Sequence, residues 1–223
     1  MSRKEITVFE DLLGSNKKIA REIRQHLTSR GILTVNLLSS PGSGKTSLLE
    51  RIAEILWPEH RLAVIEGDIE TDLDATRIKA RGVPAWQITT GGACHLEARM
   101  IARLLSEIPE ETEFLFIENV GNLVCPAAYD LGENLRLVLL SIPEGEDKPL
   151  KYPKAFLTAH CLVITKIDLL PHIPFDLEKA KGEARKINPE LAIFTTSART
   201  GEGIKELVAY LFEQRERWLK NHA

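Results

Sequence analysis

The chain has 223 residues, of which 43% are hydrophobic and 27% charged, and its formal net charge is −3. These values lie near the averages of globular proteins, so they exclude a disordered or collagen-like chain, and the interspersed charges do not favour a nucleic-acid-binding protein. The length suits one domain with a sizeable core. No apolar run is long enough for a signal peptide or a membrane span, so we expect a cytoplasmic protein that does not act at a membrane.

Short apolar runs alternate along the chain with amphipathic stretches. Residues 1–30 are expected to form a short N-terminal helical extension, and apolar runs covered by helices on both sides are typical of the strands that follow. This alternation predicts one domain over residues 1–223, an α/β fold with a doubly wound, mostly parallel sheet and helices on both faces. The expected strands are 32–38, 62–66, 84–89, 114–118, 135–142, 161–165 and 191–195; the expected helices are 17–27, 46–56, 95–108 and 203–219; the long polar stretch 143–156 is expected to be a loop.

The stretch SSPGSGKT, residues 39–46, joins an expected strand to an expected helix and predicts a phosphate-binding loop of the P-loop NTPase type. Gly42 and Gly44 let the backbone N–H groups approach a polyphosphate at the helix N-terminus. Lys45 can reach the β- and γ-phosphates, and the hydroxyl of Thr46 can ligate Mg²⁺. Ser39 replaces the glycine that opens the standard pattern. The residues expected to cradle the nucleotide phosphates are Gly42, Ser43, Gly44, Lys45, Thr46 and Ser47.

Two carboxylates at the ends of expected strands complete a catalytic set with Lys45 and Thr46. In FIENVG, residues 116–121, Glu118 stands where GTPases of the D-x-x-G type have aspartate, and Gly121 can contact the γ-phosphate. Asp68 ends another strand, and we expect it to bind Mg²⁺ together with Thr46 and Glu118. Asp72 and Asp74 are weaker candidates, since acidic residues are common in the first turn of a helix.

Two later segments resemble the guanine-binding elements of GTPases. TKID, residues 165–168, resembles N-K-x-D, in which Asp168 accepts from the guanine edge and Lys166 lies over the base. Thr165 replaces the asparagine of that pattern. TSARTGEG, residues 196–203, resembles the S-A-K element, so Ser197 and Ala198 are expected to close over the base. All these motifs lie at carboxyl ends of expected strands, where open α/β sheets bind ligands.

The three cysteines suggest two different roles. Cys161 lies inside an apolar strand and is expected to be a core residue. Cys94 follows an expected strand and Cys125 follows Gly121 by four residues, so both thiols can meet at one edge of the sheet. A two-fold dimer would present both thiols twice and supply four sulfurs for Zn²⁺ or Ni²⁺, with His95 as a further ligand. Two buried thiols without a metal remain the alternative interpretation.

The chain resembles the HypB family, the GTPases that assist nickel insertion into [NiFe]-hydrogenase, from about residue 15 to its end. The resemblance rests on the segments EGDIETDLDATRI (66–78), GGACHLEA (91–98), ENVGNLVCP (118–126) and EGEDKPLKYP (144–153). It implies a P-loop GTPase fold, slow GTP hydrolysis with Mg²⁺, and a homodimer that forms around GTP. It also implies Ni²⁺ or Zn²⁺ bound in the GTPase domain by Cys94, His95 and Cys125, and hydrogenase maturation proteins and the hydrogenase large subunit as partners.

Departures from the family pattern leave other interpretations open. The chain has neither the N-terminal C-x-x-C-G-C nickel motif nor the histidine-rich tract of many members, and Arg99 stands where some have histidine. We find no glutamine or arginine finger in the expected loops, so we expect slow hydrolysis. The alternatives are a GTPase chaperone for another metalloenzyme such as urease, a P-loop small-molecule kinase that uses ATP, and a non-catalytic binding module.

Overall fold

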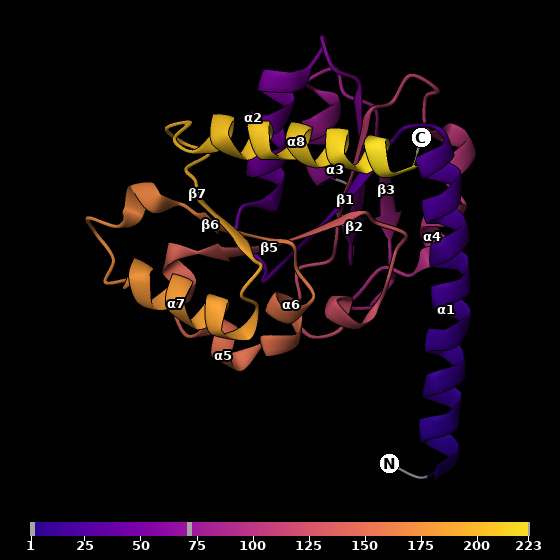
Figure 1. The fold of residues 1–223 in the computed structure, drawn as a ribbon, viewed down its shortest axis with the longest axis horizontal. Coiled ribbons are helices and arrows are strands. Elements are labelled where there is room, and N and C mark those ends of the chain that lie inside the picture. Colours follow the sequence, from indigo (N-terminus) through magenta and orange to yellow (C-terminus); the bar gives the residue numbers. More distant parts are fainter. Residues whose placement is uncertain (1–2, 71–72, 223) are drawn as a thin grey trace.

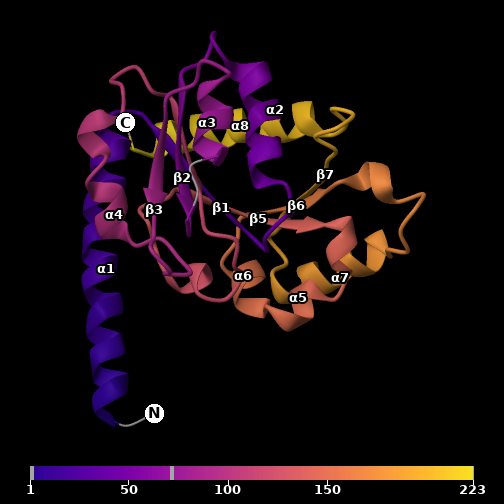
Figure 2. The ribbon, with the colours of Figure 1, turned by 180° about the vertical axis from the view of Figure 1, so that it is seen from behind.

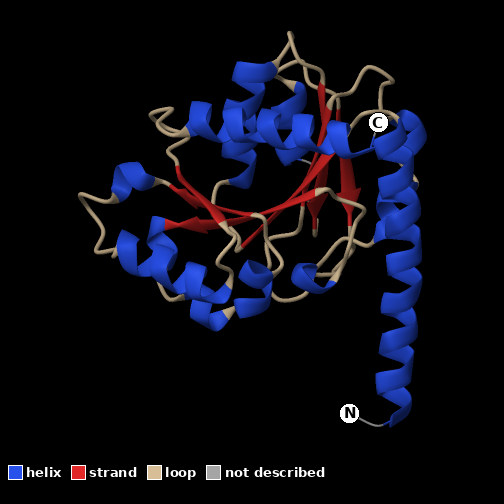
Figure 3. Ribbon diagram, in the orientation of Figure 1, coloured by secondary structure: helices blue, strands red, loops and turns tan. Residues whose placement is uncertain are grey.

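The computed structural model describes residues 3–70 and 73–222, with side chains described from residue 13 to residue 221. Within this part, seven parallel strands form one sheet in the order β3-β2-β4-β1-β5-β6-β7 (Figures 1 and 3). The strands are β1 (Leu33–Ser39), β2 (Leu62–Asp68), β3 (Ala85–Thr89), β4 (Phe114–Glu118), β5 (Leu135–Ser141), β6 (Cys161–Thr165) and β7 (Ala192–Thr195).

Helices cover both faces of this sheet, as a doubly wound α/β fold requires (Figure 3). Helices α2, α3 and α8 lie on one face, and α5, α6 and α7 lie on the other, beside β5 to β7 (Figures 1 and 2). The helices are α1 (Arg3–Ser29), α2 (Lys45–Leu56), α3 (Leu73–Lys79), α4 (Ala98–Ala102), α5 (Lys148–Lys151), α6 (Pro153–Leu157), α7 (Leu177–Ile187) and α8 (Ile204–His222).

Apolar burial explains why each helix lies where it does. Helices α2 and α8 contribute Leu49, Ile52 and Leu207 to a core that also holds Val35 and Phe116 from the central strands. Burial of such side chains contributes roughly 1.5–3 kcal/mol each to folding, so the sheet and these helices form one cooperative unit. Cys161 is fully buried in this core, which confirms the expectation that it is a packing residue.

The first helix, α1, packs against the other face of the sheet and against α4. Its buried residues Ala20, Ile23 and Leu27 share a core with Leu96 and Ile117, and its N-terminal half extends beyond the rest of the molecule (Figures 1 and 2). Within the described residues, no helix combines the length and the apolar character needed to cross a membrane.

All seven expected strands are present, but two expected elements were wrong. The expected helix 95–108 begins only at Ala98, ends at Ala102 and is followed by a 3-10 turn at Leu105–Glu107. The stretch 143–156, expected to be a loop, contains α5 and most of α6, because prolines at the first helical turns start both short helices. Helix α7, which the sequence did not predict, begins at an N-cap in which the Asp176 carboxylate accepts from the Lys179 N–H.

Candidate nucleotide and metal site

The phosphate-binding loop connects β1 to α2, and its shape depends on glycine. Gly44 is the N-cap of α2 and has φ +90°, a conformation that strains any other L-residue. Lys45 is buried, and its ammonium group donates to the Ser39 hydroxyl at 3.0 Å. The serine that departs from the standard motif therefore holds the lysine side chain in place. A cavity of about 460 Å³ lies over this loop and is lined by Gly42, Thr46 and Gly121, among others.

Acidic residues from β2 and β4 lie beneath this phosphate cavity. Thr46 Oγ1 donates to Glu118 Oε1 at 3.1 Å, and the ammonium of Lys45 lies 3.8 Å from the same oxygen. Glu66, which the sequence analysis missed, pairs in register with Glu118 across the two strands and is equally buried. Burial, reinforced by the nearby charge of Glu118, raises the pKa of Glu66 to about 11. Burial also raises the pKa of Glu118, although Lys45 opposes this shift, so Glu66 is the protonated member of the pair at neutral pH.

Asp68 and Asp74, two of the other acidic residues of the prediction, both line the phosphate cavity. Asp68 lines the phosphate cavity, and its carboxylate accepts from the Glu70 N–H at 2.9 Å. Asp74 lies in the first turn of α3 and pairs with Arg77 at 3.2 Å, while Asp72 lies outside the described residues. Arg77 also donates to the Ser47 hydroxyl at 3.2 Å and lines the same cavity, so this arginine is a further residue that the motifs did not indicate.

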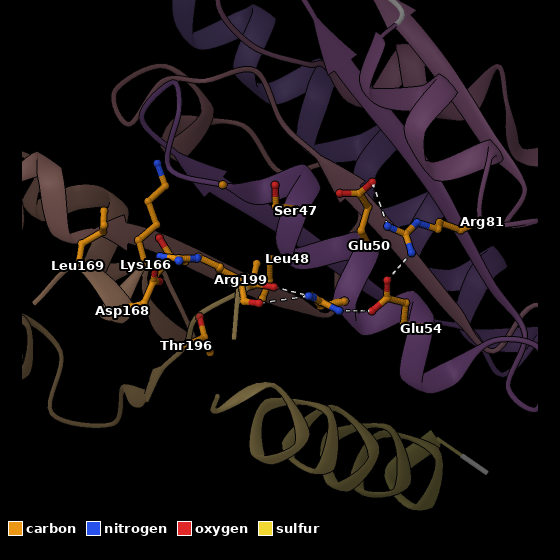
Figure 4. Close-up of a pocket in the computed structure, with 14 residues that line it drawn as sticks. Ser47, Leu48, Glu50, Glu54, Arg81, Lys166, Asp168, Leu169, Thr196 and Arg199 are labelled. Carbon is orange, nitrogen blue, oxygen red and sulfur yellow. Dashed lines mark hydrogen bonds and ion pairs between the residues drawn. The ribbon is translucent and has the colours of Figure 1, made fainter. Parts of the chain in front are cut away.

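A second cavity, of about 440 Å³, adjoins the first, and the two share Gly44, Ser47 and Lys166 (Figure 4). Asp168 lies in its wall, and the carboxylate accepts from the Ser197 hydroxyl at 2.6 Å. Thr165 points elsewhere, since its hydroxyl donates to the carbonyl of Ser43 at 2.7 Å and braces the phosphate loop against β6. The cavity therefore joins the expected base-binding elements to the phosphate loop.

Side chains from α2 and from the end of β6 hold the walls of this second cavity together. The Arg51 guanidinium donates to the carbonyl of Ala198 at 2.5 Å and pairs with Glu54 at 2.6 Å, and Glu54 also binds Arg81 (Figure 4). Lys166 has φ +61°, and its ammonium group donates to the carbonyl of Gly42 at 2.6 Å. The lysine contact ties the end of β6 to the phosphate loop, and the arginine contact ties the loop after β7 to α2.

Cys94, His95 and Cys125 form the third part of the site. One ligand atom from each residue lies within 4.8 Å of the other two, and all three side chains are partly exposed. Neighbouring residues of a helix point in different directions, but Cys94 and His95 precede α4 and are free of that restriction. Cys94 Sγ lies 3.7 Å from His95 Nδ1. Two thiols and one imidazole at this spacing are a donor set that suits Ni²⁺ or Zn²⁺.

The surroundings favour the neutral forms of the His95 imidazole and of the Cys125 thiol. Burial lowers the pKa of His95, which keeps its ring neutral at physiological pH, and the Tyr129 ring stacks on it at a centroid distance of 3.9 Å. The hydrogen bond with Cys94, together with burial, raises the pKa of the Cys125 thiol. A bound metal must therefore displace a thiol proton from this cluster.

Two asparagines join the cluster to the end of β4. The fully buried Asn119, directly after Glu118, accepts through Oδ1 from the Leu96 N–H at 3.2 Å. The Asn122 amide donates to the Cys94 carbonyl at 3.4 Å. Between them, a Cβ at Gly121 would lie 2.9 Å from Pro41 Cα of the phosphate loop, so only glycine fits. One short segment thus contacts both the phosphate loop and the thiol cluster.

Fold and site together define a P-loop nucleotide-binding protein with an added metal-ligand cluster. The family model "CobW/HypB/UreG, nucleotide-binding domain" matches residues 33–195. The chain is 51% identical over 211 residues to hydrogenase maturation factor HypB of Azotobacter vinelandii, covering 94% of this chain and 70% of the relative. It is 40% identical over 229 residues to hydrogenase/urease maturation factor HypB of Helicobacter pylori strain J99, covering 100% and 94%.

A solved structure agrees with these relatives. The crystal structure of HypB from Helicobacter pylori in complex with nickel superposes with a TM-score of 0.86 at 41% identity, covering 91% of this chain and 96% of that one. The chain therefore belongs to the HypB family of hydrogenase maturation factors, as its motifs predicted.

Proposed function

We propose that the protein is a metal-binding regulatory GTPase that assists nickel delivery into [NiFe]-hydrogenase in the cytoplasm. The observation that carries this proposal is the continuity of the segment 118–125, which begins in the phosphate cavity and ends in the thiol cluster. A change at the γ-phosphate has a direct path to the metal ligands through this segment. The nickel complex of the related Helicobacter pylori protein supports nickel as the cargo.

In this proposal the two adjoining cavities hold GTP. The backbone of Gly42–Ser47 binds the phosphates, and Lys45 neutralises charge on the β- and γ-phosphates. Asp168 accepts from the guanine N–H groups, while Lys166 covers the base. Ser197 holds the Asp168 carboxylate in place, and the backbone N–H of Ala198 faces the guanine oxygen.

Oxygen donors beneath the phosphates fit Mg²⁺. Thr46, Glu118 and Asp68 would hold the ion, which when bound would neutralise charge on the phosphates. The fit rests on a hydroxyl and a carboxylate already in contact at 3.1 Å beside the cavity. Water attack on the γ-phosphorus then breaks its bond to the bridging oxygen and yields GDP, phosphate and a proton. Hydrolysis is expected to be slow, because Arg77 is already bound to Glu50 and Asp74 rather than directed at the phosphates.

Cys94, His95 and Cys125 bind the cargo metal in this proposal. Two protomers joined at this surface would supply four sulfurs, and Val124, 60% exposed beside Cys125, gives the surface an apolar contact. GTP stabilises the dimer, and hydrolysis releases the metal to maturation proteins and the hydrogenase large subunit. If GTP changes the metal affinity by some factor, the metal must change the GTP affinity by the same factor.

The test is a Ni²⁺ titration of the purified protein, with and without Mg²⁺ and a non-hydrolysable GTP analogue, followed by the thiolate-to-nickel charge-transfer band. We expect a band that strengthens with nucleotide and is lost in Cys94→Ala and Cys125→Ala. Cys161→Ala is the control, since that thiol is fully buried in the core. Absence of a band in both nucleotide states would contradict the metal function. Displacement of bound nucleotide by ATP as readily as by GTP would instead favour a kinase.

A second candidate is a chaperone that also serves urease. The Helicobacter pylori relative, aligned over the whole of this chain, is a hydrogenase/urease maturation factor. Both candidates use the same nucleotide and metal residues. They differ in the recipient, so pull-down of the nickel-loaded protein with each apo-enzyme distinguishes them.

A further inference from the structure

The side chain of Asn16 on α1 joins the two segments that carry the candidate metal ligands. It is only 6% exposed. Its amide nitrogen donates to the carbonyl of Asp130 at 2.7 Å, and its amide oxygen accepts from the Ala98 N–H at 2.8 Å. These partners lie 114 and 82 residues away in the sequence, so no local pattern indicates this role.

The two partners lie close to the ligands on each segment. Ala98 is three residues after His95 and starts α4, so its N–H is one of the helix N-terminal donors that lack an intrahelical partner. Asp130 follows Cys125 by five residues, beyond a 3-10 turn at Pro126–Ala128. A single amide group therefore sets the separation of the two segments from a third element.

Another residue of α1 reinforces only one of the two segments. The Arg24 guanidinium donates to the Asp130 carboxylate at 2.6 Å and to the carbonyl of Glu133 at 3.0 Å. These contacts hold the segment that follows Cys125 against α1. The contact of Asn16 with Ala98 then fixes the segment of His95 relative to the same helix.

We propose that Asn16 is a positioning residue of the metal site, which holds the segment 94–98 and the segment 125–130 at the spacing the ligands need. The inference that this spacing serves a metal rests on the proposed function. Residues that orient metal ligands through hydrogen bonds typically change metal affinity 10- to 100-fold when they are replaced.

The test compares Asn16→Ala and Asn16→Asp with Asn188→Ala. Asn16→Asp keeps the acceptor for Ala98 but turns a carboxylate oxygen toward the Asp130 carbonyl, so it replaces an attraction with a repulsion. Asn188 is a matched control, because its amide also donates to carbonyls of another segment, at Phe156, Leu157 and Ala159, remote from the thiols. For each variant we would measure the Ni²⁺ dissociation constant by chelator competition, the energy and intensity of the charge-transfer band, GDP affinity and thermal unfolding.

A second measurement tests the spacing of the Cys94 and Cys125 thiols without a transition metal. A trivalent arsenical bridges two thiols only when they can approach each other, so its reaction with Cys94 and Cys125 reports the geometry directly. We expect Asn16→Ala to weaken Ni²⁺ binding about tenfold, to alter the band and to slow bridging, and Asn16→Asp to do so at least as strongly. Asn188→Ala is expected to leave Ni²⁺ affinity and bridging unchanged even where it lowers the unfolding temperature.

The outcomes separate the positioning role from the proposed function. Unchanged Ni²⁺ affinity and bridging in both Asn16 variants would overturn the positioning role. Equal losses in Asn188→Ala would also overturn it, because general destabilisation would then explain them. If the parent protein bound no Ni²⁺ while bridging still depended on Asn16, the metal function would fail and the positioning role would stand.

Discussion

Glu66 and Glu118 place two buried carboxyl groups side by side on β2 and β4. Such a pair cannot hold two charges at low cost, so one member keeps its proton. The ammonium of Lys45, 3.8 Å from Glu118, makes Glu118 the ionised member. Glu66 is then a neutral hydrogen-bond donor. The net charge beneath the phosphates comes from one carboxylate and one lysine, so it is close to zero.

This assignment predicts a pH-dependent gain in stability for Glu66→Gln. The pKa of Glu66 rises from 4.5 to about 11 on folding, so its contribution to stability is present below pH 4.5 and is lost as pH increases toward 11. Glutamine does not titrate, so the variant's free energy of unfolding relative to the parent should increase by up to about 1.4 kcal/mol per pH unit between pH 6 and pH 8. Urea denaturation without Mg²⁺ or nucleotide measures this difference.

An exposed carboxylate serves as the control for this experiment. Glu206→Gln on α8 should show no comparable pH dependence, since that side chain is exposed. A stability difference between Glu66→Gln and the parent that stays constant from pH 6 to pH 8 would mean that Glu66 is ionised in the folded protein.

At the scale of elements, the loop between β7 and α8 contains two glycines with positive φ that differ in their surroundings. A Cβ at Gly203, with φ +70°, would lie 1.9 Å from the Thr195 carbonyl oxygen, whereas a Cβ at Gly201, with φ +83°, would meet nothing within 4 Å. Gly203→Ala is expected to destabilise the protein by about 2 kcal/mol or more and to weaken GDP binding, because Ser197 and Ala198 lie in this loop.

Gly201→Ala isolates the cost of backbone strain in the same loop and should destabilise by only about 1 kcal/mol. Thermal unfolding and GDP titration of both variants check the prediction. Equal effects at the two positions would show that backbone conformation alone, and not the close approach to Thr195, requires the glycine.

In the proposed function, the segment 118–125 is the element that connects the nucleotide to the metal. Asn119→Ala removes the acceptor for the Leu96 N–H while leaving Glu118 and the thiols in place. We expect the factor by which a GTP analogue changes Ni²⁺ affinity to fall toward one, while the affinity for each ligand alone changes less. Calorimetric titrations in both orders measure this factor. A factor equal to that of the parent would exclude Asn119 from the coupling.

The apolar pattern of the sequence predicts some elements of this fold and misses others. The five inner strands were predictable because burial on both faces makes their apolar runs continuous, and the partly buried edge strands β3 and β7 are still rich in apolar residues. The start of α4 was not predictable, since residues 95–97 have helical spacing but precede the helix, with Glu97 extended at its N-cap and the buried Leu96 held by Asn119. Helix α7 buries only two small residues, Ala180 and Ala184, and most of its other residues are charged, so no apolar run marks it in the sequence.

The site was predictable where its residues form motifs along the chain. The phosphate, base and thiol residues followed from such motifs, and the structure places them around two adjoining cavities and one cluster. Glu66, Asn16 and Tyr129 act through neighbours that are distant in sequence, so no spacing reveals them. Ser39 and Thr165 looked like losses from their motifs, yet both bind other parts of the phosphate loop.

At the scale of the whole molecule, the proposed dimer predicts that a change at one surface residue prevents dimerisation. Val124 is 60% exposed beside Cys125, and Val124→Asp would place a charge at the proposed two-fold contact. We expect the variant to remain a monomer of 25.0 kDa with Ni²⁺ and a GTP analogue, whereas the parent doubles its mass. Light scattering after gel filtration measures this.

Leu157→Asp is the matched control, because Leu157 is 61% exposed but lies beside His160 at the opposite, amino-terminal end of β6. This variant should dimerise as the parent does. Dimerisation of Val124→Asp would place the contact between protomers elsewhere on the surface.

The contacts of α1 have a consequence for the order of events during synthesis. Helix α1 is synthesised before the segments that it contacts, and its hydrogen bonds to Asp130 and Glu133 join residues more than 100 positions apart. Contacts of such long range carry a high cost in loop-closure entropy and form late. Until residue 133 has emerged, Ala20, Ile23 and Leu27 lack some of the apolar residues against which they pack. They are then accessible to chaperones. Helix α1 thus docks only after the later segments that hold it have been made.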